Sequence, residues 1–112
     1  MSVDKVNKLA PIFKTLGEPN RLRILCSLGL DCRPVSDIVK ATGMTQTNVS
    51  FHLRWLRKAG LVRPERRGAF IYYCLPDGEL LEIFDTLSAW LDLKRWKEEP
   101  EETNLAKNSN IK

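Results

Sequence analysis

The sequence predicts a mainly α-helical fold with a small β-hairpin, in the order α-α-β-α-α-β-β-α. Two short helical segments near the middle of the chain are joined by a turn at Gly43. An arginine-rich, β-prone segment, residues 61–75, follows the second of them directly. Helical patterns lie before and after this group. Two short helices joined by a glycine turn and followed by a basic hairpin form a winged helix-turn-helix, which is the fold that we predict.

The first two helices are predicted from apolar residues spaced three or four positions apart. The first helix stops at Gly17, and Pro19 begins the second, because proline is tolerated in the first turn of a helix. The second helix ends near Gly29. The apolar residues at this spacing are Val6, Leu9, Phe13 and Leu16 in the first helix, and Leu22, Leu25 and Leu28, expected to point inward, in the second.

The two central helices are predicted from their capping residues. Residues 33–35 are too short for more than a connector or a small edge strand, where proline is acceptable. Ser36 is a good N-cap for the first central helix, and Thr45 is one for the second. Gly60 ends the second helix after Ala59, because glycine is free to adopt the left-handed conformation.

Residues 61–75 contain two apolar, β-prone runs on either side of a turn at residues 66–68, which predicts a hairpin. After a turn at residues 76–78, apolar residues recur at spacings of four, three and four, a stripe that could form a two-helix seam. We predict one DNA-binding and dimerisation domain over residues 1–97, followed by a polar, disordered tail over residues 98–112.

Size and charge agree with a small nucleic-acid-binding domain. A chain of 112 residues suits one domain with a modest core, and dimerisation would bury more surface. Residues 1–74 hold 13 Lys/Arg against 5 Asp/Glu, whereas residues 75–112 hold 5 against 9. A basic body with an acidic end indicates a polyanion-binding module joined to a part that avoids the polyanion.

No apolar run is long enough for a membrane span and the N-terminus lacks a signal-peptide core, so we expect a cytoplasmic protein without a membrane partner.

The second central helix has the pattern of a recognition helix. At about 100° per residue, Val49, Leu53 and Leu56 share the core side. The opposite side offers an amide, hydroxyl groups and cations, which suit base edges and phosphates. The alternative is a solvated helix face with one stray aromatic residue. The residues that we predict to contact DNA on this helix are Gln46, Thr47, Ser50, Phe51 and Arg54.

The tip of the hairpin is the second predicted DNA contact. Arg66 and Arg67, with Arg63 before them, can place guanidinium groups in or beside the minor groove. A charged, solvated turn is the alternative, but the position directly after the recognition helix favours DNA contact.

Three stretches of the chain, LGEPNRLRIL, VSDIVKATGMTQTNVSFHLRWLRKAGLV and RRGAFIYYCL, resemble the ArsR/SmtB family of repressors. The resemblance covers about residues 6–92. It implies a homodimer built from the first and last helices, two recognition helices in successive major grooves of double-stranded operator DNA, and an effector that releases the DNA. The residues expected at the dimer interface are Val6, Leu9, Phe13, Leu80, Phe84, Leu87 and Leu91.

The metal sites common in this family do not fit the sequence. Its Cys-x-Cys pair would fall at Pro34 and Ser36, and the last helix has no histidine for the family's other type of site. Antiparallel pairing of the short strand with the hairpin would instead bring Cys32 close to Cys74, with Cys26 on the preceding helix.

In a reducing cytosol we expect the three cysteines to be thiols, metal ligands or redox groups rather than structural bridges. Our hypothesis is that Cys26, Cys32 and Cys74 converge on a soft, thiophilic ion, with arsenite the best candidate because it prefers three thiolates. The alternatives are small buried hydrophobic residues and a redox or persulfide switch that uses two of the cysteines.

Other functional classes are less compatible with the sequence. His52 is the only histidine, there is no Cys-x-x-Cys and there is no phosphate-binding glycine loop, so we predict neither an enzyme nor a cofactor required for DNA binding. For His52 we expect packing or a single phosphate contact. A non-specific architectural DNA-binding protein is the alternative from another class.

Trp90 and Trp96 could cap a dimer seam or cover a small-molecule pocket.

Overall fold

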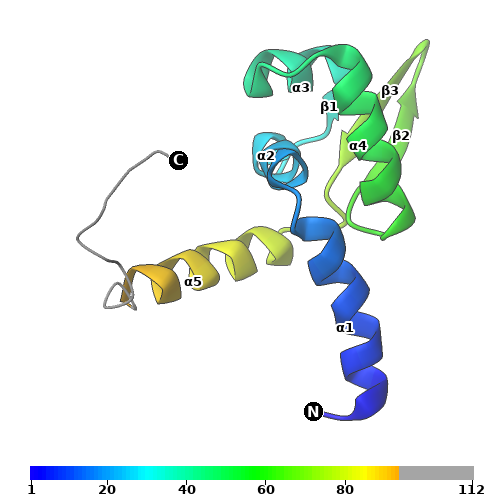
Figure 1. Cartoon of the computed structure of the whole chain (residues 1–112). Helices are drawn as coiled ribbons and strands as arrows, with labels where there is room; N and C mark the ends of the chain where they lie inside the picture. The colour runs from blue at the N-terminus through cyan, green and yellow to red at the C-terminus, as the bar shows by residue number, and fades with distance from the viewer. Residues whose placement is uncertain (94–112) are drawn as a thin grey trace. The chain divides into compact units, whose positions relative to one another are not determined.

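The computed structural model describes residues 1–93. The predicted mainly α winged helix-turn-helix is confirmed, with every element in the predicted order (Figure 1). The elements are α1 (Val3–Leu16), α2 (Pro19–Leu28), β1 (Arg33–Pro34), α3 (Val35–Thr42), α4 (Gln46–Lys58), β2 (Arg63–Arg67), β3 (Phe70–Cys74) and α5 (Glu79–Leu93). The predicted tail, residues 98–112, and Trp96 lie outside the described residues. No helix within residues 1–93 combines the length and apolar character needed to cross a bilayer.

The chain divides into two units, residues 1–81 and residues 82–112. The first unit holds α1 to β3 and the beginning of α5. The described part of the second unit is the rest of α5.

Capping groups account for most of the helix ends. The Ser2 hydroxyl accepts a hydrogen bond from the Lys5 backbone N–H at 3.1 Å, and Thr45 caps α4 in the same way for Asn48, also at 3.1 Å. The prediction for Ser36 is wrong. The helix α3 begins at Val35, directly after the extended Pro34, so Ser36 lies inside the first turn rather than before it.

The core of the first unit lies between α2, α3, α4 and the end of the sheet. The prediction for Leu25 and Leu28 is confirmed, but Leu22 is 37% exposed and Ile24 is buried instead. Successive steps of three residues rotate by about 60° around a helix, so Leu22 leaves the face that its neighbours share. The buried apolar residues are Ile24, Leu25, Leu28, Ile38, Val49, Leu53, Leu56, Leu61, Val62, Cys74 and Leu75.

The sheet has three antiparallel strands in the order β1-β3-β2. The predicted pairing of the short strand with the hairpin is therefore confirmed. Arg33 pairs with Tyr73, and Arg63 pairs with Cys74 on the other side of β3. This register brings the chain before β1 next to the end of β3, which positions the cysteines.

Candidate nucleic-acid interface and cysteine cluster

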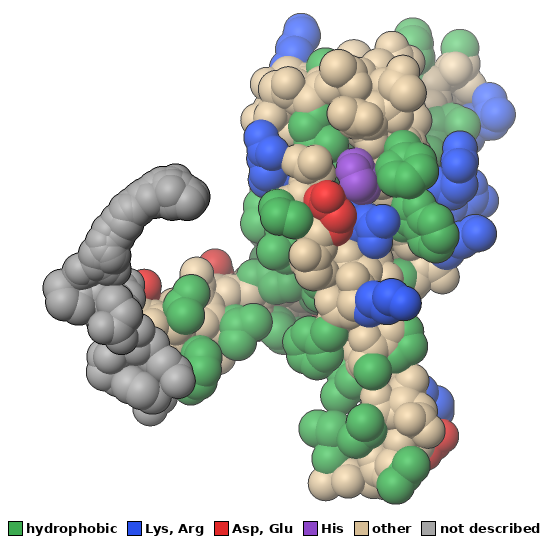
Figure 2. Space-filling model, in the orientation of Figure 1, with side chains coloured by type: hydrophobic (Ala, Val, Ile, Leu, Met, Phe, Trp, Pro, Cys, Tyr) green, Lys and Arg blue, Asp and Glu red, His purple; other side chains and the backbone are tan. Residues whose placement is uncertain are grey.

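The helix α4 separates its residues into a buried and an exposed face, as its sequence predicts. Val49, Leu53 and Leu56 are buried. The five predicted contact residues are all exposed, and they line one shallow depression on the surface: Gln46, Thr47, Ser50, Phe51 and Arg54. On the side drawn in Figure 2, Lys and Arg side chains gather along the part of the first unit that carries α4 and the hairpin (Figures 1 and 2). The depression offers hydrogen-bonding groups, an aromatic ring and a cation to one ligand surface.

His52 ties α4 to α2. Its side chain is buried, at 7% exposure, and its Nδ1 accepts a hydrogen bond from the Arg21 Nε at 3.3 Å. Arg21 also donates to the Thr15 carbonyl at 3.3 Å, and its guanidinium lies 5.5 Å from the centre of the Trp55 ring. These contacts attach the buried side of α4 to α2 and to the end of α1. The roles of Arg21 and Trp55 were missed in the sequence, because their contact joins positions 34 residues apart without a periodic signal.

Two of the hairpin arginines, Arg63 and Arg67, are held by Glu65, which no pattern in the sequence indicated. Its carboxylate pairs with Arg63 at 3.2 Å and with Arg67 at 2.9 Å. Hydrogen bonds from Arg67 and then Arg63 hold the pKa of Glu65 below its ordinary value of 4.5. The Arg67 guanidinium also lies 4.5 Å from the centre of the Tyr72 ring. Arg66 is exposed and points to the other face of the hairpin, since side chains alternate along a strand.

Cys32 and Cys74 form a disulfide, with 4.2 Å between their Cα atoms. This differs from the expectation that the cysteines form no bridge. The physical reason is the register of the sheet, because one further step from the pair Arg33–Tyr73 places Cys32 directly opposite Cys74. The predicted approach of these two cysteines thus takes place within the first unit.

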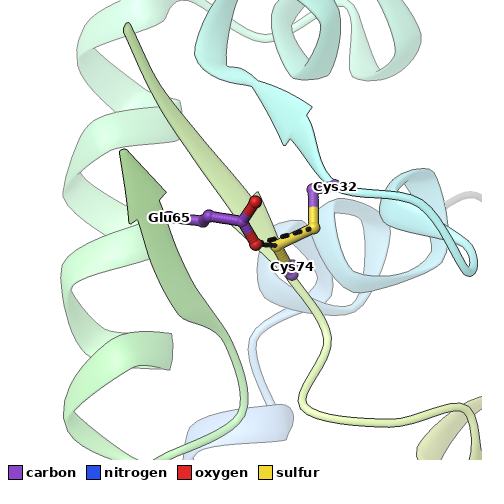
Figure 3. A group of neighbouring side chains, drawn as sticks. All are labelled: Cys32, Glu65 and Cys74. Carbon is purple, nitrogen blue, oxygen red and sulfur yellow. Dashed lines mark hydrogen bonds between the residues drawn. A yellow bond between two sulfur atoms is a disulfide. The ribbon is translucent and has the colours of Figure 1, made fainter. Parts of the chain in front are cut away.

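Glu65 completes a cluster with the two sulfurs (Figure 3). Its Oε1 lies 3.8 Å from the Cys32 sulfur and 3.7 Å from the Cys74 sulfur. In the disulfide neither sulfur carries a proton, so these are contacts, whereas in the dithiol each S–H group can donate to the carboxylate. The three ligand atoms lie within 4.8 Å of one another. Among the described residues, this is the group whose donor atoms could hold a metal ion.

The structure does not bring Cys26 into this cluster. Cys26 lies exposed on α2, and the third donor beside Cys32 and Cys74 is the Glu65 carboxylate. The pairing register of β2 with β3 is the signal that points to Glu65. Residues 65 and 63 lie on the same face of β2, and Arg63 is the partner of Cys74.

The comparisons with known proteins agree on one family. A model described as bacterial regulatory protein, arsR family, matches residues 18–63, from just before α2 to the start of β2. An uncharacterized HTH-type transcriptional regulator of Methanocaldococcus jannaschii is 37% identical over 84 residues, which is 72% of this chain and 92% of the relative.

Two further relatives have names that describe repressors. The transcriptional repressor SmtB homolog of Synechocystis is 33% identical over 75% of this chain and 64% of its own length. The arsenical resistance operon repressor of Bacillus subtilis is 38% identical over 61% of this chain and 66% of its own length. The chain thus spans less than two thirds of the length of these two relatives.

One solved structure matches most of the chain. It is the homodimeric winged helix-turn-helix DNA-binding domain of a possible ArsR-family regulator from Mycobacterium bovis. It has 28% sequence identity and a TM-score of 0.72, over 90% of this chain and 97% of that chain.

Proposed function

The chain belongs to the ArsR family of bacterial regulatory proteins, and from this premise we propose that it is a sequence-specific, DNA-binding transcriptional repressor. The observation that carries the proposal is the exposed face of α4, where five side chains suited to base edges, sugars and phosphates line one depression. The opposite face of the same helix is buried in the core, which fixes the direction in which the exposed face points.

In the proposed complex α4 lies in the major groove and the hairpin lies beside the minor groove. Arg54 on α4 and Arg66 at the hairpin contact phosphates or groove edges. Arg67 contributes positive charge that Glu65 partly offsets, since the two groups are 2.9 Å apart. The basic side of the first unit steers the protein to DNA without itself selecting a sequence.

The repressor acts as a homodimer in this proposal, with α1 and α5 supplying the interface. No residue of Val3–Leu16 or Glu79–Leu93 is buried within the chain. Both helices therefore leave large apolar side chains exposed to solvent, including Phe13 at 61% exposure and Leu91 at 63%. Contact with a second copy would remove this surface from water. The interface residues are those expected from the sequence: Val6, Leu9, Phe13, Leu80, Phe84, Leu87 and Leu91.

DNA binding is tested with duplexes selected from a random pool by the full-length protein. The selected operator should compete at least about a thousandfold better than random duplex DNA at one fixed salt concentration. A ratio near one would contradict sequence-specific repression and leave an architectural DNA-binding protein.

Arg54→Ala should weaken operator binding and lower its salt dependence by about one unit of slope, because one phosphate or groove contact is lost. The charge-matched control is Lys8→Ala. Lys8 lies on α1, where it is paired with Asp4 at 3.3 Å, and its loss should leave binding nearly unchanged. Equal effects of the two substitutions would mean that only net charge matters.

The effector in this proposal is a thiophilic metal or metalloid ion, with arsenite as the first candidate. Soft thiolate ligands select soft ions. Once reduced, Cys32 and Cys74 supply two such thiolates. The third ligand is either the Cys26 thiolate of the sequence-based hypothesis or the Glu65 carboxylate, which already lies beside both sulfurs. The name of the arsenical resistance operon repressor supports arsenite among the soft ions.

The effector is tested by titrating arsenite into reduced protein on its operator. Release should require Cys32 and Cys74. Release that persists in the double variant, Cys32→Ser together with Cys74→Ser, would therefore reject this site. Cys26→Ser and Glu65→Gln then identify the third ligand. Substitution of the residue that binds the ion should raise the arsenite concentration for half release at least about tenfold. Substitution of the other residue should leave that concentration unchanged. DNA affinity without arsenite is measured for each variant as the control.

A further inference from the structure

We propose that the Cys32–Cys74 pair is a thiol–disulfide exchange site for small-molecule disulfides, in which Cys32 is the sulfur that reacts and Cys74 the one that closes the bond. The chemistry of this site is independent of DNA. Its consequence for regulation rests on the proposed function.

The strands bring the two cysteines together without any other element having to move. Cys32 lies one residue before β1 and Cys74 is the last residue of β3, and the ladder places them opposite each other. Their Cα atoms are 4.2 Å apart and their sulfurs are bonded. Because the backbone pairing of Arg33 with Tyr73 sets this arrangement, the reduced pair stays within reach of oxidation.

The two cysteine residues differ in their exposure to solvent. Cys74 ends the central strand of the sheet and is 2% exposed. Cys32 is partly exposed and precedes β1, a two-residue strand at the edge of the sheet. Exchange needs an in-line approach to the sulfur that reacts, so a small disulfide can reach Cys32 far more readily than Cys74.

The reaction balances with one small disulfide, RSSR, as the oxidant. The Cys32 thiolate attacks one sulfur of RSSR, forms the mixed disulfide Cys32–S–S–R and expels RS⁻, which takes up the proton that Cys32 lost. The Cys74 thiolate then attacks the Cys32 sulfur and expels the second RS⁻, which takes up the proton from Cys74. The protein thus loses two electrons and two protons, and RSSR becomes two RSH.

Glu65 is placed to hold the reduced pair, and two arginines offset its charge. Its Oε1 is 3.7 to 3.8 Å from both sulfurs, so it can accept an S–H hydrogen bond from either thiol. Arg63 and Arg67 offset its negative charge at 3.2 and 2.9 Å. A thiolate that forms beside Glu65 therefore does not face an uncompensated anion.

The bond closes a covalent loop, residues 32–74, that contains β1, α3, α4, β2 and β3. This loop is the complete DNA-reading part of the proposed repressor. Since the disulfide uses both sulfurs, the oxidised protein has no thiolates at this site for an ion. Oxidation therefore keeps the DNA-reading part assembled and makes the repressor unresponsive to its effector.

The exchange is tested on full-length protein with oxidised glutathione as the probe, in a Cys26→Ser background that removes the third thiol. Reduced Cys26→Ser protein should close the Cys32–Cys74 disulfide. Adding Cys74→Ser should trap glutathione on Cys32, and adding Cys32→Ser should modify Cys74 at least about tenfold more slowly, as followed by mass spectrometry.

Equal rates for the two cysteines, or failure of the Cys26→Ser protein to close the disulfide, would overturn the proposal. Circular dichroism of each variant checks that it is folded. This arm uses neither DNA nor an ion, so it decides the exchange site even if arsenite is not the effector.

The regulatory consequence is tested by arsenite release from operator DNA before and after oxidation. The oxidised protein should need at least about tenfold more arsenite for half release, and dithiothreitol should restore the response. Equal release from both forms would show that the disulfide does not control the site. Lack of release from the reduced form would count against the proposed effector alone.

Discussion

α4 has 13 residues and α5 has 15, yet α4 has four buried residues and none between Glu79 and Leu93 is buried in α5. The apolar side of α4 is covered by α2, α3 and the rest of the first unit, and its polar side remains outside. In α5 the apolar side chains themselves remain outside, among them Leu87 and Trp90, each at 53% exposure. α4 therefore leaves polar groups exposed to a partner. α5 leaves apolar groups exposed instead.

The Cys32–Cys74 disulfide lies in the same unit as α4, so breaking it tests how far packing alone stabilises that unit. On the chain-entropy model, a bond between residues 42 positions apart stabilises the fold by about 4 kcal/mol. Denaturant unfolding of oxidised and reduced protein should differ by roughly that amount. Cys26→Ser protein serves as the control with an unchanged bond. A difference near zero would mean that packing alone holds residues 32–74 in their fold.

Leu53→Ala removes a core side chain of α4 that is 1% exposed. The lost burial and the cavity left behind should lower the free energy of unfolding by about 2–5 kcal/mol. Denaturant unfolding at several protein concentrations measures it, and the loss should be similar at each. A small loss would indicate that α4 is less completely packed than its burial implies.

Leu87→Glu should act on association rather than on the core. A charge in the apolar stripe of α5 should raise the dimer dissociation constant at least about tenfold, because it would have to be desolvated in the interface. Analytical ultracentrifugation measures this directly. Ala89→Glu adds the same charge about half a turn away from the stripe on the same helix, and it should leave the dimer intact. If both variants dissociate equally, the stripe is not the interface.

Glu65 should give the smallest effect, and one that depends on pH. Its pKa is lowered in the folded state by Arg67 and Arg63, so its ion pairs stabilise the fold above pH 4.5. That contribution should disappear as the pH falls from 4.5 through the lower folded-state pKa. Glu65→Gln should therefore be less stable than the unaltered protein near neutral pH and equal to it in acid, as measured by thermal unfolding. A constant difference at all pH values would assign the effect to packing.

Local patterns in the sequence predicted the helices and strands. The contacts that these patterns did not predict depend on pairing between distant segments. Thr45 and the apolar spacing of α4 act within one helix, and the structure confirms both. The pairing of Arg33 with Tyr73 could be expected only from a fold, and it brought Cys32 to Cys74. Glu65 was missed because its role depends on the register between β2 and β3, whereas Cys26 was included because it is close in sequence.

The covalent loop also has a mechanical consequence. The segment with α1 and α2 enters the loop at Cys32, and the segment with α5 leaves it at Cys74. Both segments are therefore anchored at one point, where the two Cα atoms are 4.2 Å apart. With the bond closed, a pull between the two segments passes through two sulfur atoms. With the bond open, the same pull passes through 41 residues of backbone, including α4.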